Sequence, residues 1–261
     1  MPASFYTNIQ KMQMIAEYLE GETADIVGKR YGVSRTTICR TLRVQGFEAR
    51  SDVECQRTHK LDVSVFDNLA QEARYWIGFL LSDGCIHGVT KKTAIISLAL
   101  CRKDAGHVAK WRDFLKSDYR IELTPKSARL AFRSLELANR LAVFGIVPRK
   151  TGRECPPDVL KNDRDFWRGM IDGDGTITHL NTPWPTVSIC GSRAACQGFI
   201  DFCLGHISTK ASPTKIRGKN CWHVSLRGSG ARAIAYILYN GATISLDRKQ
   251  VRADLIGSAA A

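Results

Sequence analysis

The sequence lacks any hydrophobic run long enough to cross a membrane. Its longest apolar stretches, Tyr75–Leu81 and Ala94–Cys101, are far shorter than the roughly 20 residues that a spanning helix needs. Residues 1–10 also lack the basic-then-apolar pattern of a secretory signal. We therefore expect no membrane partner and a location in the cytoplasm, an organelle or another host-cell interior.

Several signatures of metal and nucleotide chemistry are missing too. The nine cysteines are unevenly spaced without a CxxC pair, and none of the six histidines belongs to an HExxH or finger-like pattern. No GxxxxGK[ST] loop occurs. These absences argue against zinc fingers, HExxH zinc enzymes and P-loop nucleotide hydrolysis. We interpret the cysteines as reduced, mostly buried small residues.

Acidic residues are scarce relative to basic ones. The chain has 38 Lys and Arg against 25 Asp and Glu, a formal charge of +13. Residues 1–60 contain nine basic and seven acidic residues, so eleven of the thirteen excess charges lie after residue 60. Such a balance indicates a polyanionic partner such as nucleic acid. The larger, later part of the chain must itself face that partner.

Residues 1–50 are predicted to form a helix followed by a helix-turn-helix. Gly28 lets the last two helices approach, Gly32 makes the turn and Ser34 caps the last helix. The inward residues at helical spacing are Val27, Val33, Ile38 and Leu42. The outward residues, which could reach bases and phosphates, are Arg35, Thr36, Arg40 and Arg43. The segment resembles the helix-turn-helix units of resolvases and small regulators. A plain helical hairpin with a solvated basic face is the alternative.

A linker is predicted at 51–66, and two similar repeats follow at 67–152 and 153–255, with a tail after Leu255. Each repeat reads as helix, two strands, helix, two strands, helix, which predicts an α+β fold with two pseudo-symmetric αββαββα halves. The expected helices span 72–83, 105–116 and 135–144, then 165–174, 194–204 and 231–239. The expected strands span 93–101, 119–125 and 128–133, then 176–180, 186–190, 214–219 and 222–227. Two such halves suit a nearly symmetric partner such as a duplex site.

The strongest signal is a pair of matching nonapeptides, Trp76-Ile-Gly-Phe-Leu-Leu-Ser-Asp-Gly84 and Trp167-Arg-Gly-Met-Ile-Asp-Gly-Asp-Gly175. Large apolar residues fall at the same offsets in both, which predicts one buried helical face. Small residues form a second shared stripe, Gly78 with Ser82 and Gly169 with Gly173. The two helices are expected to pack through these stripes and to bring their C-terminal ends side by side.

Both helices are expected to end in Asp followed by Gly, at Asp83 and Asp174, with the glycine in a left-handed turn. A carboxylate at a helix C-terminus meets the negative end of the dipole, and a second one nearby adds repulsion. A divalent cation such as Mg²⁺ would resolve this conflict because it binds carboxylate oxygens. One Asp-Gly pair indicates only a turn, whereas two in matching helices indicate a site.

The nonapeptides resemble the paired LAGLIDADG motifs of single-chain homing endonucleases, and the resemblance extends from about residue 68 to 252. It implies a saddle-shaped fold and a monomeric, site-specific endonuclease of a mobile genetic element, active in intron homing. Such an enzyme makes a double-strand break in a long, pseudo-palindromic DNA target. The resemblance further implies that Asp83 and Asp174 bind Mg²⁺ or another divalent cation, aided by the main-chain carbonyls of Ser82 and Gly173. Motif one has Leu81 where motif two has Asp172, so Asp172 is interpreted as non-essential.

The resemblance also assigns a basic residue to each half, after its last predicted helix. Lys150 and Lys249 follow the matching aspartates by 67 and 75 residues. They would lie beside the scissile phosphates and stabilise developing charge or order the attacking water. Surface lysines favoured by a helix end are the alternative. The rival basic residues for this role are Arg149, Arg153 and Arg248.

The strands of each half would present a saddle to the major groove of DNA. Strand alternation predicts that Arg120, Glu122, Arg129 and Arg133 share one face in the first half. In the second half it predicts a shared face of Lys215, Arg217, Lys219, His223, Ser225 and Arg227. A merely solvated sheet face is the alternative for these residues. For the whole protein, the alternatives are a maturase that binds intron RNA and a non-catalytic DNA-binding regulator.

Overall fold

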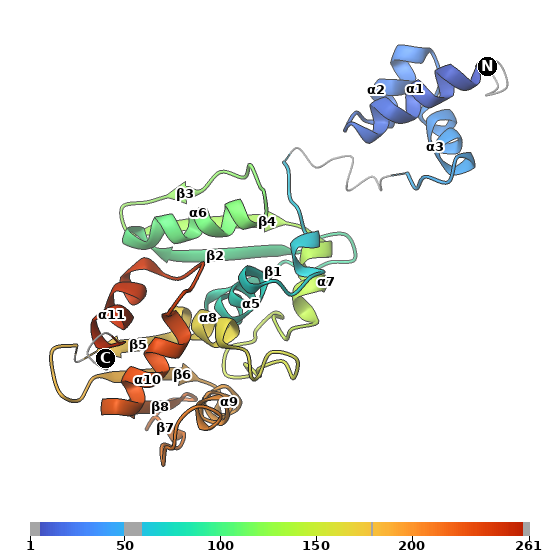
Figure 1. Cartoon of the computed structure of the whole chain (residues 1–261). Helices are drawn as coiled ribbons and strands as arrows, with labels where there is room; N and C mark the ends of the chain where they lie inside the picture. The colour runs from blue at the N-terminus through green and yellow to red at the C-terminus, as the bar shows by residue number, and fades with distance from the viewer. Residues whose placement is uncertain (1–5, 50–58, 179, 258–261) are drawn as a thin grey trace. The chain divides into compact units, whose positions relative to one another are not determined.

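A computed structural model of the chain describes residues 6–49, 59–178 and 180–257. Its internal contacts divide the chain into two units, Met1–Thr58 and His59–Ala261 (Figure 1). The predicted linker lies partly outside the described residues. No helix in the described part of the chain combines the length and apolar character that a membrane crossing requires.

The N-terminal unit contains three helices, α1 (Asn8–Leu19), α2 (Ala24–Tyr31) and α3 (Arg35–Val44). Gly32 adopts the left-handed conformation (φ 68°) and makes the turn between α2 and α3, and the Ser34 side chain accepts a hydrogen bond from the Thr37 amide, both as predicted. A Cβ on Gly28 would lie 2.7 Å from the Val33 carbonyl oxygen, so only glycine permits this approach. The small core of this unit consists of Met14, Ile15, Tyr18, Ala24, Val27, Ile38 and Leu42.

The outer face of α3 carries the polar side chains expected there. Thr36, Arg40 and Arg43 are exposed. Arg35 lies 3.9 Å from the Asp25 carboxylate, on the preceding helix. The last helix of the unit therefore presents a basic surface.

Residues 59–66 belong to the larger unit, so the linker does not extend to residue 66 as the sequence pattern predicts. Val63 and Phe66 are buried in the larger core, and a short 3-10 helix, η2 (Ser64–Phe66), joins them. The Ser117 hydroxyl donates to the Lys60 carbonyl oxygen. Two apolar residues three positions apart fill one 3-10 turn, a pattern too short to give a periodic signal.

The larger unit contains the two expected halves, each with one four-stranded antiparallel sheet (Figure 1). The first sheet has the order β1-β2-β4-β3 and the second the order β5-β6-β8-β7. The first half comprises α5 (Gln71–Asp83), β1 (Cys85–His87), β2 (Ile95–Cys101), η3 (Arg102–Asp104), α6 (Ala105–Phe114), β3 (Glu122–Leu123), β4 (Ser127–Arg133) and α7 (Leu135–Ala142). The second comprises α8 (Arg164–Asp174), β5 (Gly175–Thr178), β6 (Thr186–Gly191), α9 (Arg193–Leu204), β7 (Thr214–Lys215), β8 (Trp222–Arg227), α10 (Gly228–Tyr239) and α11 (Asp247–Gly257).

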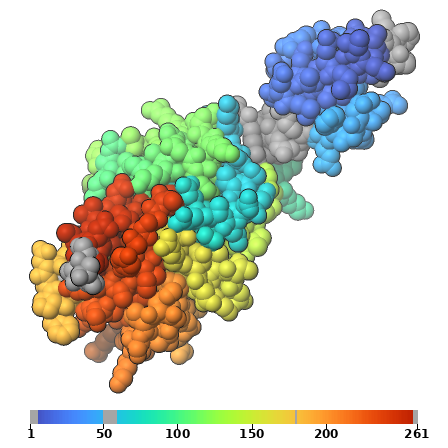
Figure 2. All heavy atoms as spheres, viewed as in Figure 1, coloured from blue at the N-terminus to red at the C-terminus, as the bar shows by residue number. Residues whose placement is uncertain are grey.

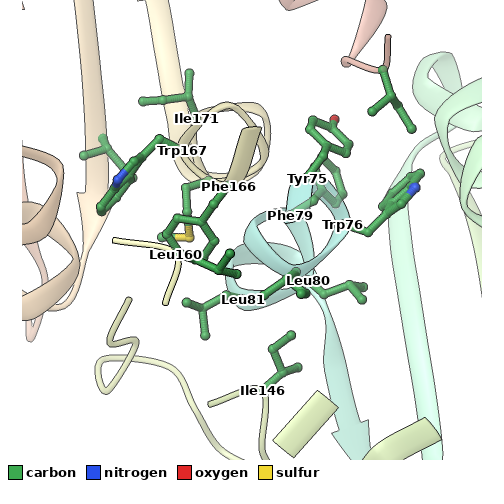
Figure 3. Close-up of a cluster of buried hydrophobic side chains, with 14 of the residues drawn as sticks. Tyr75, Trp76, Phe79, Leu80, Leu81, Ile146, Leu160, Phe166, Trp167 and Ile171 are labelled. Atoms are coloured by element: carbon green, nitrogen blue, oxygen red, sulfur yellow. The ribbon is translucent and has the colours of Figure 1, made fainter. Parts of the chain in front are cut away.

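Helices α5 and α8 pack together between the two sheets, and their apolar side chains fill the core on either side (Figure 3). A Cβ on Gly169 would lie 2.1 Å from the Tyr75 carbonyl oxygen, so the helix backbones touch through the predicted small-residue stripes. Trp76 and Trp167 are fully buried, each turned to the core of its own half. The two matched helices therefore set the geometry of everything attached to their ends.

Besides the short 3-10 helices η2 and η3, one strand and one helix were not predicted from the sequence. The edge strand β1 has only three residues, too few for a visible alternation. Helix α11 buries Lys249, Ala253 and Ile256, so a lysine supplies part of the face that would ordinarily be apolar. Because Ile256 is fully buried, the chain does not become a tail at residue 255. Figure 2 shows this segment, in red, beside the green surface of the first half. Arg248 of this helix pairs with Asp104 of the first half.

Candidate active site

The two helices that pack together end at Asp83 and Asp174, as predicted. The glycines that follow are extended rather than left-handed: Gly84 has φ −68° and ψ 146°, and Gly175 has φ −92° and ψ 173°. A Cβ on either glycine would lie 2.6 Å from a carbonyl oxygen of the last helical turn. Glycine is therefore required here for space, because the chain turns directly from the helix into the first strand.

The two carboxylates lie in the same electrostatic environment. Burial, together with the neighbouring charge of Asp83, raises the pKa of Asp174 to about 6. Solvent reaches the Asp83 side chain, yet the surrounding protein still raises its pKa. A Cβ on Gly173 would lie 2.4 Å from the Ser82 Cβ and 3.4 Å from the Asp83 Oδ2, so the small residue of one helix leaves room for the serine that precedes the carboxylate of the other.

Lys150 and Lys249 lie at these helix ends and are buried, with 7% and 3% of their surface exposed. The Lys150 Nζ donates to the Ser82 carbonyl oxygen at 2.6 Å. The Lys249 Nζ donates to the carbonyl oxygens of Ile171, Asp172 and Gly175 at 2.6 to 2.8 Å. Each ammonium thus neutralises the carbonyl end of one helix.

The lysines and carboxylates form one cluster of charges. Burial lowers the pKa of Lys150 and lowers that of Lys249 to about 8. Both ammonium groups in turn oppose the rise in the pKa of Asp83 and Asp174. The predicted basic residues are therefore placed beside the predicted carboxylates, in both halves.

The rival arginines are placed differently. Arg149 and Arg153 are exposed, and Arg149 occupies the left-handed region with φ 57°. The Arg248 Nε lies 3.2 Å from both carboxylate oxygens of Asp104. The lysines of the two segments, and not these arginines, donate to the ends of α5 and α8.

The donor set fits a hard divalent cation. Asp83 and Asp174 supply carboxylates, and Ser82 and Gly173 carry main-chain carbonyls at the helix ends, all oxygen donors of the kind Mg²⁺ prefers. The raised pKa of both aspartates shows that the protein alone leaves their negative charge only partly compensated. Within the described ranges, no three His, Cys, Asp or Glu side chains gather as a metal cluster. A cation here would thus complete its shell with carbonyl, water or phosphate oxygens.

Asp172 is the residue whose role the sequence does not reveal. It is buried and accepts hydrogen bonds from the Tyr75 hydroxyl (2.7 Å), the Tyr239 hydroxyl (2.6 Å) and the Leu246 amide (2.6 Å). Burial raises its pKa. The sequence did contain a sign of a buried polar network. Asp165, Arg168 and Asp172 are spaced along one side of α8, and all three are buried.

Each sheet packs one face against the core of its half, and its other face, called the open face, does not contact that core. In β4, Arg129 and Arg133 lie on this open face while the alternate residues are buried, and Glu122 is paired opposite Arg129. In β8, His223, Ser225 and Arg227 lie on the open face. Both sets follow the predicted alternation.

Three other residues depart from that alternation. The register pairs Lys215 with Trp222 and Thr214 with His223, so Lys215 shares the face of Trp222 and not that of His223. Arg217 and Lys219 lie in the turn between β7 and β8, because β7 ends at Lys215. The sequence pattern predicted a strand over 214–219, which is longer than β7, and so gave the wrong face for these residues. In the first half, Arg120 is exposed but precedes β3.

Comparison with solved structures identifies the architecture. No protein-family model matches the sequence, and no curated protein is similar to it. The LAGLIDADG homing endonuclease I-GzeII in complex with its DNA target has a TM-score of 0.50 and 12% identity, covering 70% of this chain and 88% of that chain. The I-SmaMI LAGLIDADG homing endonuclease bound to cleaved DNA has a TM-score of 0.51 and 12% identity, covering 70% and 86%. This chain therefore has the fold of the LAGLIDADG homing endonucleases.

Proposed function

We propose that the protein is a metal-dependent DNA endonuclease that cuts both strands of a long, nearly symmetric duplex site. The observation that carries the proposal is the pair Asp83 and Asp174, held together at the ends of two packed helices with the pKa of Asp174 at about 6. A sequence selected for stability alone would not place two carboxylates there whose charge is only partly compensated. The DNA complexes of the structural neighbours support the same conclusion.

In the proposed reaction, Asp83 and Asp174 hold a divalent cation together with the carbonyl oxygens of Ser82 and Gly173. When bound, the cation supplies an activated water and neutralises charge at the leaving 3′ oxygen. The lysines keep a positive charge beside the reacting phosphates. Lys150 has one carbonyl partner among the described residues, which leaves N–H donors for a phosphate oxygen. Lys249 already donates to several carbonyls, so it acts mainly through its charge.

The proposed DNA contacts come from both units. The open sheet faces present Arg129, Arg133 and Arg227, and Arg40 and Arg43 on α3 offer a second basic surface. Phosphate contacts from these arginines would fix the register on the duplex, while base edges in the major groove carry the sequence information. A monomer suffices for this proposal because one chain contains both halves.

The test is cleavage of a random duplex library with Mg²⁺, followed by sequencing of the ends. Discrete double-strand breaks are expected from the wild type, whereas Asp83→Asn and Asp174→Asn should bind the recovered duplex without cutting both strands. Undiminished cutting by either variant would contradict the assignment of the carboxylates. Binding without breaks by the wild type would instead point to a regulator or an RNA maturase.

A further inference from the structure

The segment between α10 and α11 is held by two buried charged side chains of α8. The Arg168 guanidinium donates to the carbonyl oxygens of Leu238 (3.0 Å) and Ile244 (2.8 Å). The Asp172 carboxylate accepts from the Tyr239 hydroxyl and the Leu246 amide, both at 2.6 Å. Four hydrogen bonds from one helix thus fix residues 238–246 at both ends.

This segment leads directly to Lys249. Helix α11 begins at Asp247, one residue after the amide that Asp172 binds. The Lys249 ammonium then reaches the carbonyl oxygens of Ile171 and Gly175, on either side of the α8 terminus. Alignment of one ammonium with several carbonyls at 2.6 to 2.8 Å requires that the start of α11 be placed accurately against α8.

The first half has no equivalent of this arrangement. At the matching motif positions it carries Ile77 and Leu81 instead of Arg168 and Asp172, and both are buried apolar residues. Lys150 follows a left-handed Arg149 in a loop, not a helix, and donates to the single carbonyl of Ser82. The two lysines are therefore positioned by different means.

The network also joins the two halves. The Tyr75 hydroxyl of α5 donates its only proton to Asp172, so at its 2.9 Å contact with His107 it is the His107 Nε2 that donates. Within the described part of the chain, Tyr75 donates to Asp172 but makes no hydrogen bond to residues 238–246. It therefore provides a control that perturbs the buried carboxylate without releasing the segment.

We infer that Asp172 and Arg168 are positioning residues that set the Lys249 ammonium at the second centre alone, so the two centres of the proposed nuclease are not equivalent. The inference rests on the proposed function for its effect on cleavage, but its structural part does not. Truncating a buried charge also destabilises a fold in general, so the test must separate misplacement of Lys249 from loss of stability.

The first experiment needs no nuclease activity. The folded full-length protein is reductively methylated at one fixed pH, and the peptides of Lys249 and Lys150 are quantified by mass spectrometry. Asp172→Asn and Asp172→Leu are expected to raise the labelling rate of Lys249 about tenfold relative to Lys150, the effect of losing one hydrogen bond to a charged group. Tyr75→Phe should leave this ratio unchanged. An unchanged ratio in both Asp172 variants, or a parallel rise for both lysines, overturns the inference.

The second experiment uses a duplex recovered from the library by wild-type cleavage and labelled separately on each strand. Asp172→Asn is expected to slow one strand about tenfold more than the other and to accumulate a nicked duplex. Equal slowing of both strands would show a merely structural role and overturn the inference. A wild type that cuts no duplex would refute the proposed function, while the labelling experiment would still decide the positioning of Lys249.

Discussion

The Cα of Gly78 faces the backbone of Phe166 so closely that a Cβ would lie 2.0 Å from the Phe166 carbonyl oxygen. The contact is between two helix backbones and involves no flexible side chain that could move away. Gly169 makes the reciprocal approach to Tyr75. The position of the two helix ends, and hence of both carboxylates, depends on this approach.

Gly78→Ala is therefore expected to destabilise the larger unit by about 3 kcal/mol, because the helices must separate to admit the methyl group. Gly106→Ala is the matched control: Gly106 also lies in a helix, α6, and a Cβ there meets nothing within 4 Å. The control should be neutral or slightly stabilising, since alanine favours helix. Urea unfolding of both variants measures the difference. Equal midpoints would show that the helices are not held by backbone contact.

A second prediction concerns the aspartate pair without metal. The pKa of folded Asp174 is about 6 and that of an unfolded aspartate is about 3.9. The fold therefore disfavours the ionised form, and this penalty is fully present above pH 6 and disappears as the pH falls toward 4. Asp174→Asn should raise the free energy of unfolding at pH 8 in EDTA by about 2 kcal/mol, allowing for partial exposure.

Added Mg²⁺ should make the wild type more stable than the aspartate variants. It is expected to raise the melting temperature of the wild type, because a ligand of the folded state stabilises it, and to have little effect on the double variant Asp83→Asn/Asp174→Asn. Asp118→Asn, an exposed aspartate remote in sequence, controls for a general salt effect. An equal Mg²⁺ response in all three proteins would argue against a cation at the helix ends.

The element order and the helix pairing could be predicted because they depend on local patterns that occur twice. The stripes of small and large residues in α5 and α8 specify which faces touch, and no distant information is needed. The roles of Gly84 and Gly175 could not be predicted in this way. Asp-Gly indicates a left-handed turn in general, whereas here the glycines make room for an extended exit against the last helical turn.

The other incorrect or missed predictions arise where polar residues occupy buried positions that are ordinarily apolar. They also arise where strand register decides which face of the sheet a side chain lies on. Lys249 forms part of the buried face of α11, so the sequence lacks the apolar periodicity that would have predicted this helix. Asp172 differs from Leu81 in the other motif, yet it is satisfied by donors from three other segments that are brought together only in the fold. The face of Lys215 depends on the pairing of β7 with β8, which the sequence of either strand alone does not specify.

The strand register gives a further prediction, about the proposed DNA surface. Arg227 lies on the open face of β8, whereas Lys215 lies on the opposite face at the sheet edge. Arg227→Ala is expected to weaken binding to duplex DNA in EDTA and to reduce the slope of log affinity against log salt by about 1. Lys215→Ala removes the same charge and should change the slope much less. Identical slopes for the two variants would show that net charge, and not the open face, governs binding.

The last prediction follows from His107, which is 2% exposed and surrounded by Trp76, Phe79 and Tyr75. Burial lowers the pKa of His107 to about 3, against about 6.5 in an unfolded chain. As the pH falls below 6.5, the His107 imidazole is therefore protonated in the unfolded state but stays neutral in the folded state. The neutral imidazole thus contributes stability that is complete above that pH and is lost progressively toward pH 3.

Between pH 7 and pH 5 this linkage should lower the free energy of unfolding by about 2 kcal/mol in the wild type. His107→Gln keeps a side-chain N–H for the Tyr75 hydroxyl but cannot titrate, so it should lack this component. The measurement is the difference in unfolding free energy between the two proteins at each pH, because Asp83 and Asp174 titrate in both and cancel. The wild type should lose its advantage as the pH falls. A difference that stays constant from pH 7 to pH 5 would show that the buried imidazole is protonated in the folded state, or that solvent reaches it.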